Sequence, residues 1–173
     1  MVKQLSVFDI EQPLESPRTQ KEHHRWQLFV DGASRNNPGK AGIGIYIVRD
    51  NQPYYQNGYF VGIKTNNQAE YLALIVGMLL LRQWVHEDDL IEIRSDSLLV
   101  VQQLNGRWSI KHPDLKPLQM LARKLLASYQ HTIIHIMREQ NSKADAMANV
   151  GIDEKRMIEP ALHDALAGYG ITL

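Results

Sequence analysis

Apolar and polar residues follow one another along this chain in blocks that predict a domain of mixed strands and helices. Three strand-length apolar blocks come first, separated by turn-forming residues, at 26–31, 41–48 and 54–63. Helix-length blocks follow at 65–84, 97–104, 113–130, 142–149 and 153–166, and strand-length blocks at 90–94 and 131–137. This order predicts an α/β domain with a five-stranded mixed sheet, in which three antiparallel strands precede two parallel strands and helices cover both faces.

The first 25 residues differ in composition from the rest of the chain. They carry four acidic and four basic residues, and Pro13 and Pro17 interrupt any helix. Such a polar segment cannot bury enough apolar surface to offset its ordering entropy, so we expect a flexible tail over 1–25. We expect one globular domain over 26–150 and a helical extension over 151–173, for which packing on the sheet and a dimer contact are both open.

Four acidic residues stand where the predicted elements converge. The helix expected at 65–84 is apolar nearly all round, and Glu70 inside it is costly to bury unless it is paired or metal-bound. Asp31 ends the first strand, Asp96 follows the fourth, and Asp145 lies in the first turn of a helix. Singly, these three suit a turn, a helix cap and a helix-dipole partner. Together, the acids predict an oxygen-only site for Mg²⁺ or Mn²⁺, because a cation relieves their mutual repulsion.

Charge and composition exclude several classes of protein. The 173 residues include 19 basic, 19 acidic and no cysteine residues, which excludes disulfides and zinc–thiolate or iron–sulfur sites. No apolar run approaches the ~18 residues of a membrane span, and the first residues do not resemble a secretory signal, so a cytoplasmic protein is expected. Zero net charge by itself argues against a nucleic-acid partner. Between Leu104 and His131, however, five bases stand against the single acid Asp114.

The segments that carry the four acids identify a family. They read DGASRNNPG over 31–39, TNNQAEY over 65–71, SDS over 95–97 and NSKADAMA over 141–148. In this order they resemble the four signature segments of type 1 ribonuclease H, and the resemblance covers approximately 26–150. It implies a ribonuclease H-like fold and a ribonuclease H catalytic domain over that range.

The resemblance also implies an activity and its cofactor. The activity is endonucleolytic hydrolysis of the RNA strand of an RNA–DNA hybrid, which leaves 3′-hydroxyl and 5′-phosphate ends. Two Mg²⁺ ions, for which Mn²⁺ could substitute, would be bound by the catalytic residues Asp31, Glu70, Asp96 and Asp145. Asp31 and Asp96 would be shared between the ions. Glu70 would lie on the leaving-group side, and Asp145 would hold the ion that activates water.

Residues near the four acids are expected to bind the hybrid, because small residues and backbone groups can reach 2′-hydroxyls in its shallow minor groove. The expected substrate-binding residues are Gly32, Ser34, Asn36, Asn37, Thr65, Asn66, Asn67, Ser97, Trp108, Lys111 and Asn141. Several of them also suit purely structural roles. Asn36 fits a tight turn, Asn66 fits a helix cap, and Trp108 could either stack on a DNA sugar or cover an edge of the core.

The sequence departs from the family pattern in two places. The loop before Asn141 is short and lacks the histidine that many members carry, and His135 falls inside a predicted strand. Arg138 or Glu139 is a candidate replacement. The Lys- and Trp-rich handle of many bacterial members is also missing, which places the chain with bacterial and archaeal members lacking both features. Weaker hybrid binding is expected, because fewer phosphate contacts are available.

A short peptide near the N-terminus predicts a protein partner. Residues 4–8 contain Gln4, Leu5, Val7 and Phe8, and resemble the peptide by which bacterial replication and repair proteins bind the DNA sliding clamp. Such a tether would raise the local concentration of the enzyme at DNA and indicate a role in DNA replication. The alternative is a tail that folds back and packs Phe8 on the domain.

Two other functions fit the same residues. One is a non-catalytic module that binds hybrids, although a pure binder gains nothing from clustered carboxylates. The other is a ribonuclease H-like nuclease that cuts a different duplex, because a fold alone does not define a substrate.

Overall fold

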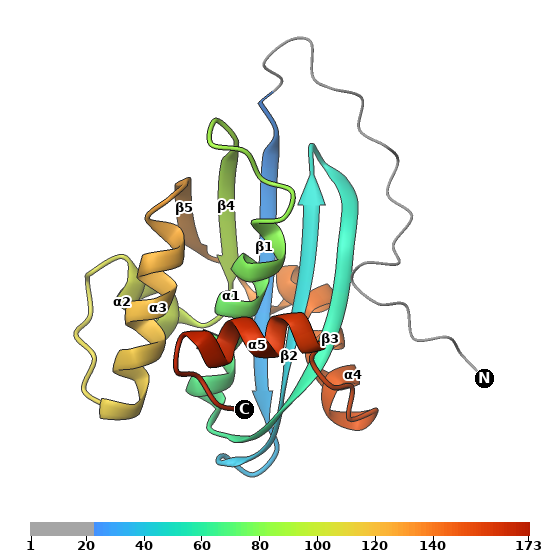
Figure 1. Cartoon of the computed structure of the whole chain (residues 1–173), viewed down its shortest axis with the longest axis vertical. Helices are drawn as coiled ribbons and strands as arrows, with labels where there is room; N and C mark the ends of the chain where they lie inside the picture. The colour runs from blue at the N-terminus through green and yellow to red at the C-terminus, as the bar shows by residue number, and fades with distance from the viewer. Residues whose placement is uncertain (1–22) are drawn as a thin grey trace.

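The computed structural model describes residues 23–173, and in these the predicted mixed sheet is present (Figure 1). The strands are β1 (Arg25–Ser34), β2 (Gly39–Arg49), β3 (Gln52–Lys64), β4 (Leu90–Ser95) and β5 (Gln130–His135). The helices are α1 (Asn66–Leu81), α2 (Leu98–Leu104), α3 (Lys116–Leu126), α4 (Ser142–Asp153) and α5 (Pro160–Gly168). Two short 3₁₀ helices, Pro113–Leu115 and Arg138–Asn141, precede α3 and α4.

The sheet has the strand order β3-β2-β1-β4-β5, which confirms the predicted fold class. The first three strands form an antiparallel meander, and β4 and β5 then add in parallel to β1. Asp50 and Asn51 connect β2 to β3 with φ angles of 50° and 65°, the left-handed conformation that suits a two-residue hairpin turn. The parallel arrangement of β1 and β4 matters for function, because it brings their carboxyl ends together at one edge of the sheet.

Helix α1 lies on one face of the sheet and is buried over most of its length, as its apolar sequence predicts. It begins with a capping box, in which the Thr65 hydroxyl accepts from the Gln68 N–H at 3.2 Å and Gln68 accepts from the Thr65 N–H at 2.9 Å. On the sheet, Leu28 and Val30 pack against α1 at Gly77. The start of α1 is therefore fixed by its own sequence and its body by the core.

Helix α4 lies on the opposite face and approaches the sheet unusually closely. A methyl group at Gly44 would overlap the main-chain carbonyl of Ala144, and one at Gly58 would overlap that of Met147. Glycine at these two strand positions therefore allows the helix backbone to rest directly on the sheet. The short distance between the α4 backbone and the sheet determines where the first turn of α4, which carries Asp145, lies relative to β1.

A buried carboxylate fastens the start of β1. Asp89, 1% exposed, accepts hydrogen bonds from the His24 N–H, the Trp26 indole Nε1–H and the His86 N–H at 2.9, 2.9 and 3.0 Å. A buried carboxylate bonded in this way is tolerated because several donors replace its hydration. Asp89 thus ties the first strand to the loop that precedes β4.

The C-terminal extension, residues 151–173, differs in detail from its prediction. Helix α4 continues to Asp153, and the last helix begins at Pro160 because proline suits the first position of a helix. Between them the chain runs along the outer edge of β3, where the Phe60 N–H donates to the Arg156 carbonyl at 2.7 Å. Helix α5 then crosses the sheet on the face that α1 covers, so the extension packs on the domain (Figure 1).

Two further sequence-based expectations concern the N-terminal peptide and membrane-spanning helices. The predicted clamp-binding peptide at residues 4–8 lies outside the described residues. Among residues 23–173, no helix is long and apolar enough to cross a lipid bilayer.

Candidate active site

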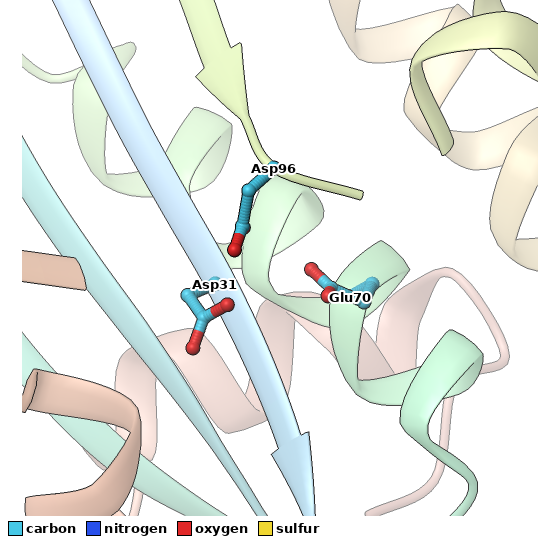
Figure 2. Close-up of side chains that lie close together, drawn as sticks. All are labelled: Asp31, Glu70 and Asp96. Atoms are coloured by element: carbon cyan, nitrogen blue, oxygen red, sulfur yellow. The ribbon is translucent and has the colours of Figure 1, made fainter. Parts of the chain in front are cut away.

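Three of the four predicted acidic residues meet at the edge of the sheet. Asp31 is part of β1, Asp96 directly follows β4, and Glu70 projects from the second turn of α1 (Figure 2). The register pairs Val30 with Ser95, so the next residue of each parallel strand is one of the two aspartates. Carboxylate oxygens of the three residues lie within 4.8 Å of one another. Sequence positions 31, 70 and 96 therefore form one cluster.

Burial and mutual repulsion change the acidity of this cluster. Asp31 and Glu70 are each 6% exposed. Burial, followed by the charges of Asp96 and Asp145, raises the pKa of Asp31 to about 7. Burial and the charges of Asp31 and Asp96 raise the pKa of Glu70 well above its usual value. The cluster is therefore costly to ionise fully without a positive charge beside it.

Glu70 is oriented by the residue that follows Asp31. The Gly32 N–H donates to Glu70 Oε2 at 3.1 Å, which opposes part of the rise in the Glu70 pKa. Gly32 is buried, and a side chain there would overlap the backbone of α1 at Ala69 and Glu70. Gly32 therefore lets α1 pack closely against β1, and its contact with substrate stays a prediction.

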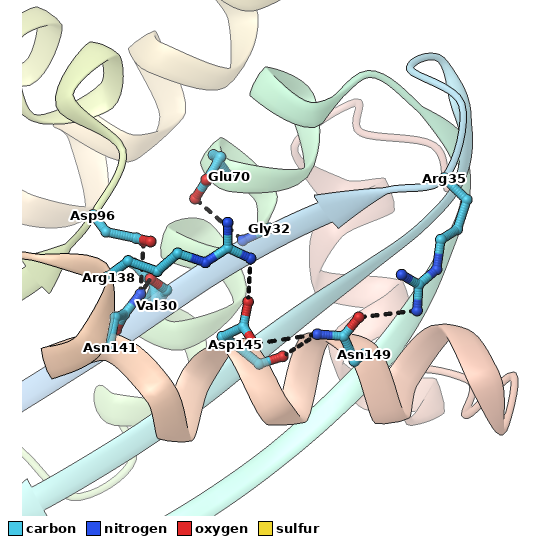
Figure 3. A network of polar contacts seen from close by, with 9 residues as sticks. All are labelled: Val30, Gly32, Arg35, Glu70, Asp96, Arg138, Asn141, Asp145 and Asn149. Carbon is cyan, nitrogen blue, oxygen red and sulfur yellow. Dashed lines mark hydrogen bonds and ion pairs between the residues drawn. The ribbon is translucent and has the colours of Figure 1, made fainter.

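Asp145 lies outside the three-carboxylate cluster, although its charge reaches Asp31. Its carboxylate forms an ion pair with Arg138 at 3.0 Å (Figure 3). The Asn149 amide donates to the main-chain oxygen of Asp145 at 2.9 Å and to its carboxylate at 3.3 Å, and accepts from Arg35 at 2.9 Å. Asn149 and Arg35 are not among the site residues predicted from the sequence. The spacing of four residues between Asp145 and Asn149 on one helix was the available signal.

Arg138 places a positive charge close enough to act on the cluster. Its charge lowers the pKa of Asp31 and of Glu70, although burial and carboxylate repulsion outweigh this effect. The side chain is 77% exposed, so it is free to leave the site. Of the two candidate replacements for the loop histidine, Arg138 therefore contacts the site through its ion pair with Asp145.

The donor set fits a divalent cation. All three clustered groups are carboxylates, which suit Mg²⁺ or Mn²⁺. Burial and carboxylate repulsion raise the pKa of Asp31 despite the opposing charge of Arg138. A bound cation would supply that charge and favour the ionised form of each carboxylate.

Asn141 and His135 hold Asp96 in place. Asn141 is completely buried and donates from one amide nitrogen to the Val30 carbonyl at 3.0 Å and to Asp96 Oδ1 at 2.8 Å. The His135 ring lies 3.1 Å from the Asp96 carbonyl. The Asn141 side chain therefore bonds within the protein, and its contact with substrate stays a prediction.

The predicted substrate residues of the turn after β1 surround the start of α1. Asn36 and Asn37 are exposed, and Asn36 has a φ angle of 61°. Asn37 Oδ1 accepts from the Asn66 N–H at 2.8 Å, and the Ser34 hydroxyl donates to the Lys64 carbonyl at 2.7 Å. The turn is thus fastened to the end of β3 and the start of α1 while the Asn36 side chain stays accessible.

A second group of predicted substrate residues lines a hollow beside α1 and α2. The hollow has a volume of about 490 Å³, and Asn67, Trp108 and Lys111 are among its lining residues. Trp108 is 48% exposed. Ser97 instead caps α2, where its hydroxyl accepts from the Val100 N–H at 3.4 Å. An exposed indole beside a lysine can stack on a sugar or base and pair with a phosphate.

Known proteins are similar to this chain in sequence. A family model described as reverse transcriptase-like matches residues 29–151. Ribonuclease HI of Halobacterium salinarum is 41% identical over 132 residues, which make up 75% of this chain and 65% of the relative. Ribonuclease H of Coxiella burnetii is 36% identical over 73% of this chain and 89% of its own length. This chain therefore spans just under two thirds of the Halobacterium relative.

Solved structures agree with these relatives. The crystal structure of RNase H1 from Halobacterium salinarum has a TM-score of 0.72 and 40% sequence identity, covering 75% of this chain and 98% of that one. LC11-RNase H1 in complex with RNA/DNA hybrid has a TM-score of 0.68 and 32% sequence identity. The match covers 76% of this chain and 97% of that one.

The mixed sheet, with carboxylates from β1, α1 and the residue after β4 clustered together, defines a protein of the ribonuclease H fold class. The chain belongs to the reverse transcriptase-like family, and the relatives that it resembles include ribonucleases H from an archaeon and a bacterium.

Proposed function

We propose that this protein is a metal-dependent endonuclease that hydrolyses the RNA strand of RNA–DNA hybrids. The observation that carries the proposal is the cluster of Asp31, Glu70 and Asp96 at the edge of a ribonuclease H-like sheet. Similarity to ribonucleases H supports the activity, and the hybrid-bound LC11 structure supports the substrate. A cluster of buried, mutually repelling carboxylates has no evident value to a protein that only binds hybrids.

We assign Asp31, Glu70 and Asp96 as ligands of Mg²⁺, with Asp145 as the ligand that completes a second site. When bound, two such ions supply activation of the attacking water and stabilisation of the departing 3′ oxygen. Mn²⁺ is expected to substitute, because it accepts the same oxygen ligands. Asp145 is paired with Arg138. This arginine has to release the Asp145 carboxylate before that carboxylate can act as a ligand.

The remaining residues position the hybrid. Asn36 and Asn37 lie on an exposed turn that can bond 2′-hydroxyl groups in the minor groove. Thr65 and Asn66 are at the start of α1, where the positive end of the helix dipole favours a phosphate. Trp108, with Lys111 beside it, is placed to contact the DNA strand. Few basic residues are available, so binding should be modest and weakly dependent on salt.

At phosphorus the reaction forms one bond and breaks one, while the attacking water loses a proton and the departing 3′ oxygen gains one. Water adds to the phosphorus atom and the bond to the 3′ oxygen breaks, which leaves 3′-hydroxyl and 5′-phosphate ends. Arg138, next to Asp145 and near the other acids, is the better placed of the two proposed histidine replacements, whereas a role for Glu139 stays a prediction.

One assay separates the three candidate functions. Labelled RNA–DNA hybrid, RNA duplex and DNA duplex are incubated with wild type or Asp96→Asn, in Mg²⁺, Mn²⁺ or EDTA. We expect wild type to cut only the RNA of the hybrid, and Asp96→Asn to be slower by about 1,000-fold, equivalent to about 4 kcal/mol of transition-state stabilisation. Binding without cleavage in every metal would support the binding module, and preferential cutting of another duplex would support the related nuclease.

The sliding clamp is a second proposed partner and rests on the sequence of residues 4–8 alone. Full-length protein should bind immobilised bacterial clamp, and a Leu5→Ala, Phe8→Ala double variant should bind at least about tenfold more weakly, because two apolar anchors are lost. Cleavage of a short hybrid should be the same in both proteins. Equal clamp binding by the double variant would overturn this part of the proposal.

A further inference from the structure

Asn141 occupies an unusual position behind the carboxylates. Its side chain is 0% exposed, yet its amide nitrogen donates to Asp96 Oδ1 and to the carbonyl of Val30, the residue before Asp31 (Figure 3). One rigid planar group therefore links β1 to the residue that follows β4. These are the two strands that supply the aspartates of the cluster.

The orientation of this amide is fixed by its surroundings. Both contacts of Nδ2 are to acceptor oxygens, so rotation of the amide by 180° would replace two hydrogen bonds with two oxygen–oxygen repulsions. The other amide atom, Asn141 Oδ1, is buried and has no hydrogen-bond partner among the described protein atoms. A buried unpaired acceptor lowers stability. Asn141 therefore donates hydrogen bonds to two oxygen atoms, the Val30 carbonyl and Asp96 Oδ1, while its own Oδ1 stays without a hydrogen bond.

His135 restrains the same aspartate from another direction. A carbonyl oxygen can only accept, so the contact of 3.1 Å requires His135 Nε2 to donate to the Asp96 main-chain oxygen. Next to it, the Ile136 N–H donates to the Ser95 carbonyl at 3.0 Å. The main chain of Asp96 is thus held by β5, and its side chain is held by Asn141.

We propose that Asn141, assisted by His135, is a positioning residue that sets the placement of Asp96 relative to Asp31 and thereby the cation affinity of the cluster. This inference rests on the proposed function, because it takes these carboxylates to be metal ligands. Hydrogen-bonding partners behind metal ligands commonly affect metal affinity by about 10- to 100-fold. Neither residue needs to touch the hybrid for this role.

The test measures metal binding without substrate. Mn²⁺ is titrated into full-length, metal-free wild type and Asn141→Leu by isothermal titration calorimetry. Leucine has a similar size but no donor, so we expect Mn²⁺ to bind about 10- to 100-fold more weakly. At saturating Mn²⁺, the kcat for hybrid cleavage should still be reduced, while KM for the hybrid should stay within about twofold, because the substrate surface is unchanged.

A matched control separates positioning from general loss of stability. Asp89→Asn removes part of a buried hydrogen-bonding centre near the start of β1, so it should lower the melting temperature but leave Mn²⁺ affinity unchanged. If Asn141→Leu does not fold, His135→Ala and His135→Gln carry the test, since this side chain is exposed. The alanine variant should bind Mn²⁺ several-fold more weakly, and glutamine, which keeps a donor, should restore part of the affinity.

The possible results point to different conclusions. Wild-type Mn²⁺ affinity in a folded Asn141→Leu variant, or in His135→Ala when only that variant is measurable, would overturn the inference while leaving the proposed function intact. Failure of wild type itself to bind Mn²⁺ and to cut hybrid would overturn the proposed function as well.

Discussion

Replacement of Asp31 by asparagine is expected to reduce hybrid cleavage by about 1,000-fold or more and also to stabilise the metal-free protein near neutral pH. The loss of cleavage follows from the loss of a central metal ligand, and corresponds to about 4 kcal/mol of transition-state stabilisation. The gain in stability follows from the burial of Asp31 beside Asp96 and within reach of Asp145, which makes its ionised form costly in the folded state.

The direction of the pH dependence follows from proton binding. Asp31 has a pKa of about 7 in the folded protein, whereas an unfolded aspartate has a pKa of about 3.9. Between these values the folded state retains a proton that the unfolded state has lost. The free energy of unfolding therefore falls as pH rises from about 4 to about 7, by about 2–4 kcal/mol, and changes little above that range. The raised pKa of Glu70 acts in the same direction.

Denaturation by urea in EDTA at several pH values between 5 and 8 measures this effect. Wild type should lose stability as pH rises, and Asp31→Asn should have a clearly shallower dependence. Addition of Mg²⁺ should stabilise wild type far more than the variant, because a ligand stabilises the state that binds it. Asp153→Asn is the control, since Asp153 is exposed on α4 and pairs only with exposed Arg35 in the contacts described. A less stable Asp31→Asn at pH 7.5 in EDTA would contradict the argument.

The second large effect is expected for Gly44→Ala. The added methyl group would overlap the carbonyl of Ala144, so α4 has to move away from the sheet. We expect a loss of about 3 kcal/mol or more, at the upper end of the usual cost of overpacking, because the clash is with backbone. Hybrid cleavage should also fall by at least about tenfold, since α4 carries Asp145 and a displacement of about 1 Å can cost 100-fold.

Gly168→Ala provides the matched control for that variant. Gly168 is the last residue of α5, and an added methyl group would have no neighbour within 4 Å. Alanine favours helix by up to about 1 kcal/mol relative to glycine, so stability should stay constant or increase and cleavage should be unchanged. For both variants, urea denaturation measures the free energy of unfolding, and a hybrid-cleavage assay measures activity. Wild-type stability in Gly44→Ala would show that the α4 backbone does not lie as close to the sheet as described.

The sequence was sufficient to predict the sheet and the meeting of three acids, because both depend on local patterns. Alternating apolar blocks indicated the five strands, and Glu70 stood out in an apolar helix. The residues Asp31 and Asp96 could be paired because parallel strands bring their carboxyl ends to the same edge. Each of these inferences needs only periodicity and strand order.

Other features depend on contacts between distant segments and could not be predicted in this way. The bond from Asn141 to Val30 joins residues 111 positions apart, and that from Asp89 to Trp26 joins residues 63 apart. In the sequence, Asn141 belongs to the segment that carries Asp145, but nothing there indicates that its side chain reaches Val30. Asp145 was assigned to the cluster, but its neighbour Arg138 holds it in an ion pair. Which partner a side chain prefers depends on packing, which a one-dimensional pattern does not contain.

The path of the C-terminal extension has a consequence for behaviour at high concentration. The outermost strands of an open sheet expose backbone groups that can pair with strands of other molecules and lead to aggregation. Arg156 accepts a backbone hydrogen bond from Phe60 on β3, and at the opposite edge the Asn105 side chain donates to the Ile133 carbonyl of β5 at 3.1 Å. Both margins of the sheet are thus partly occupied by the chain itself, which disfavours the growth of intermolecular sheets.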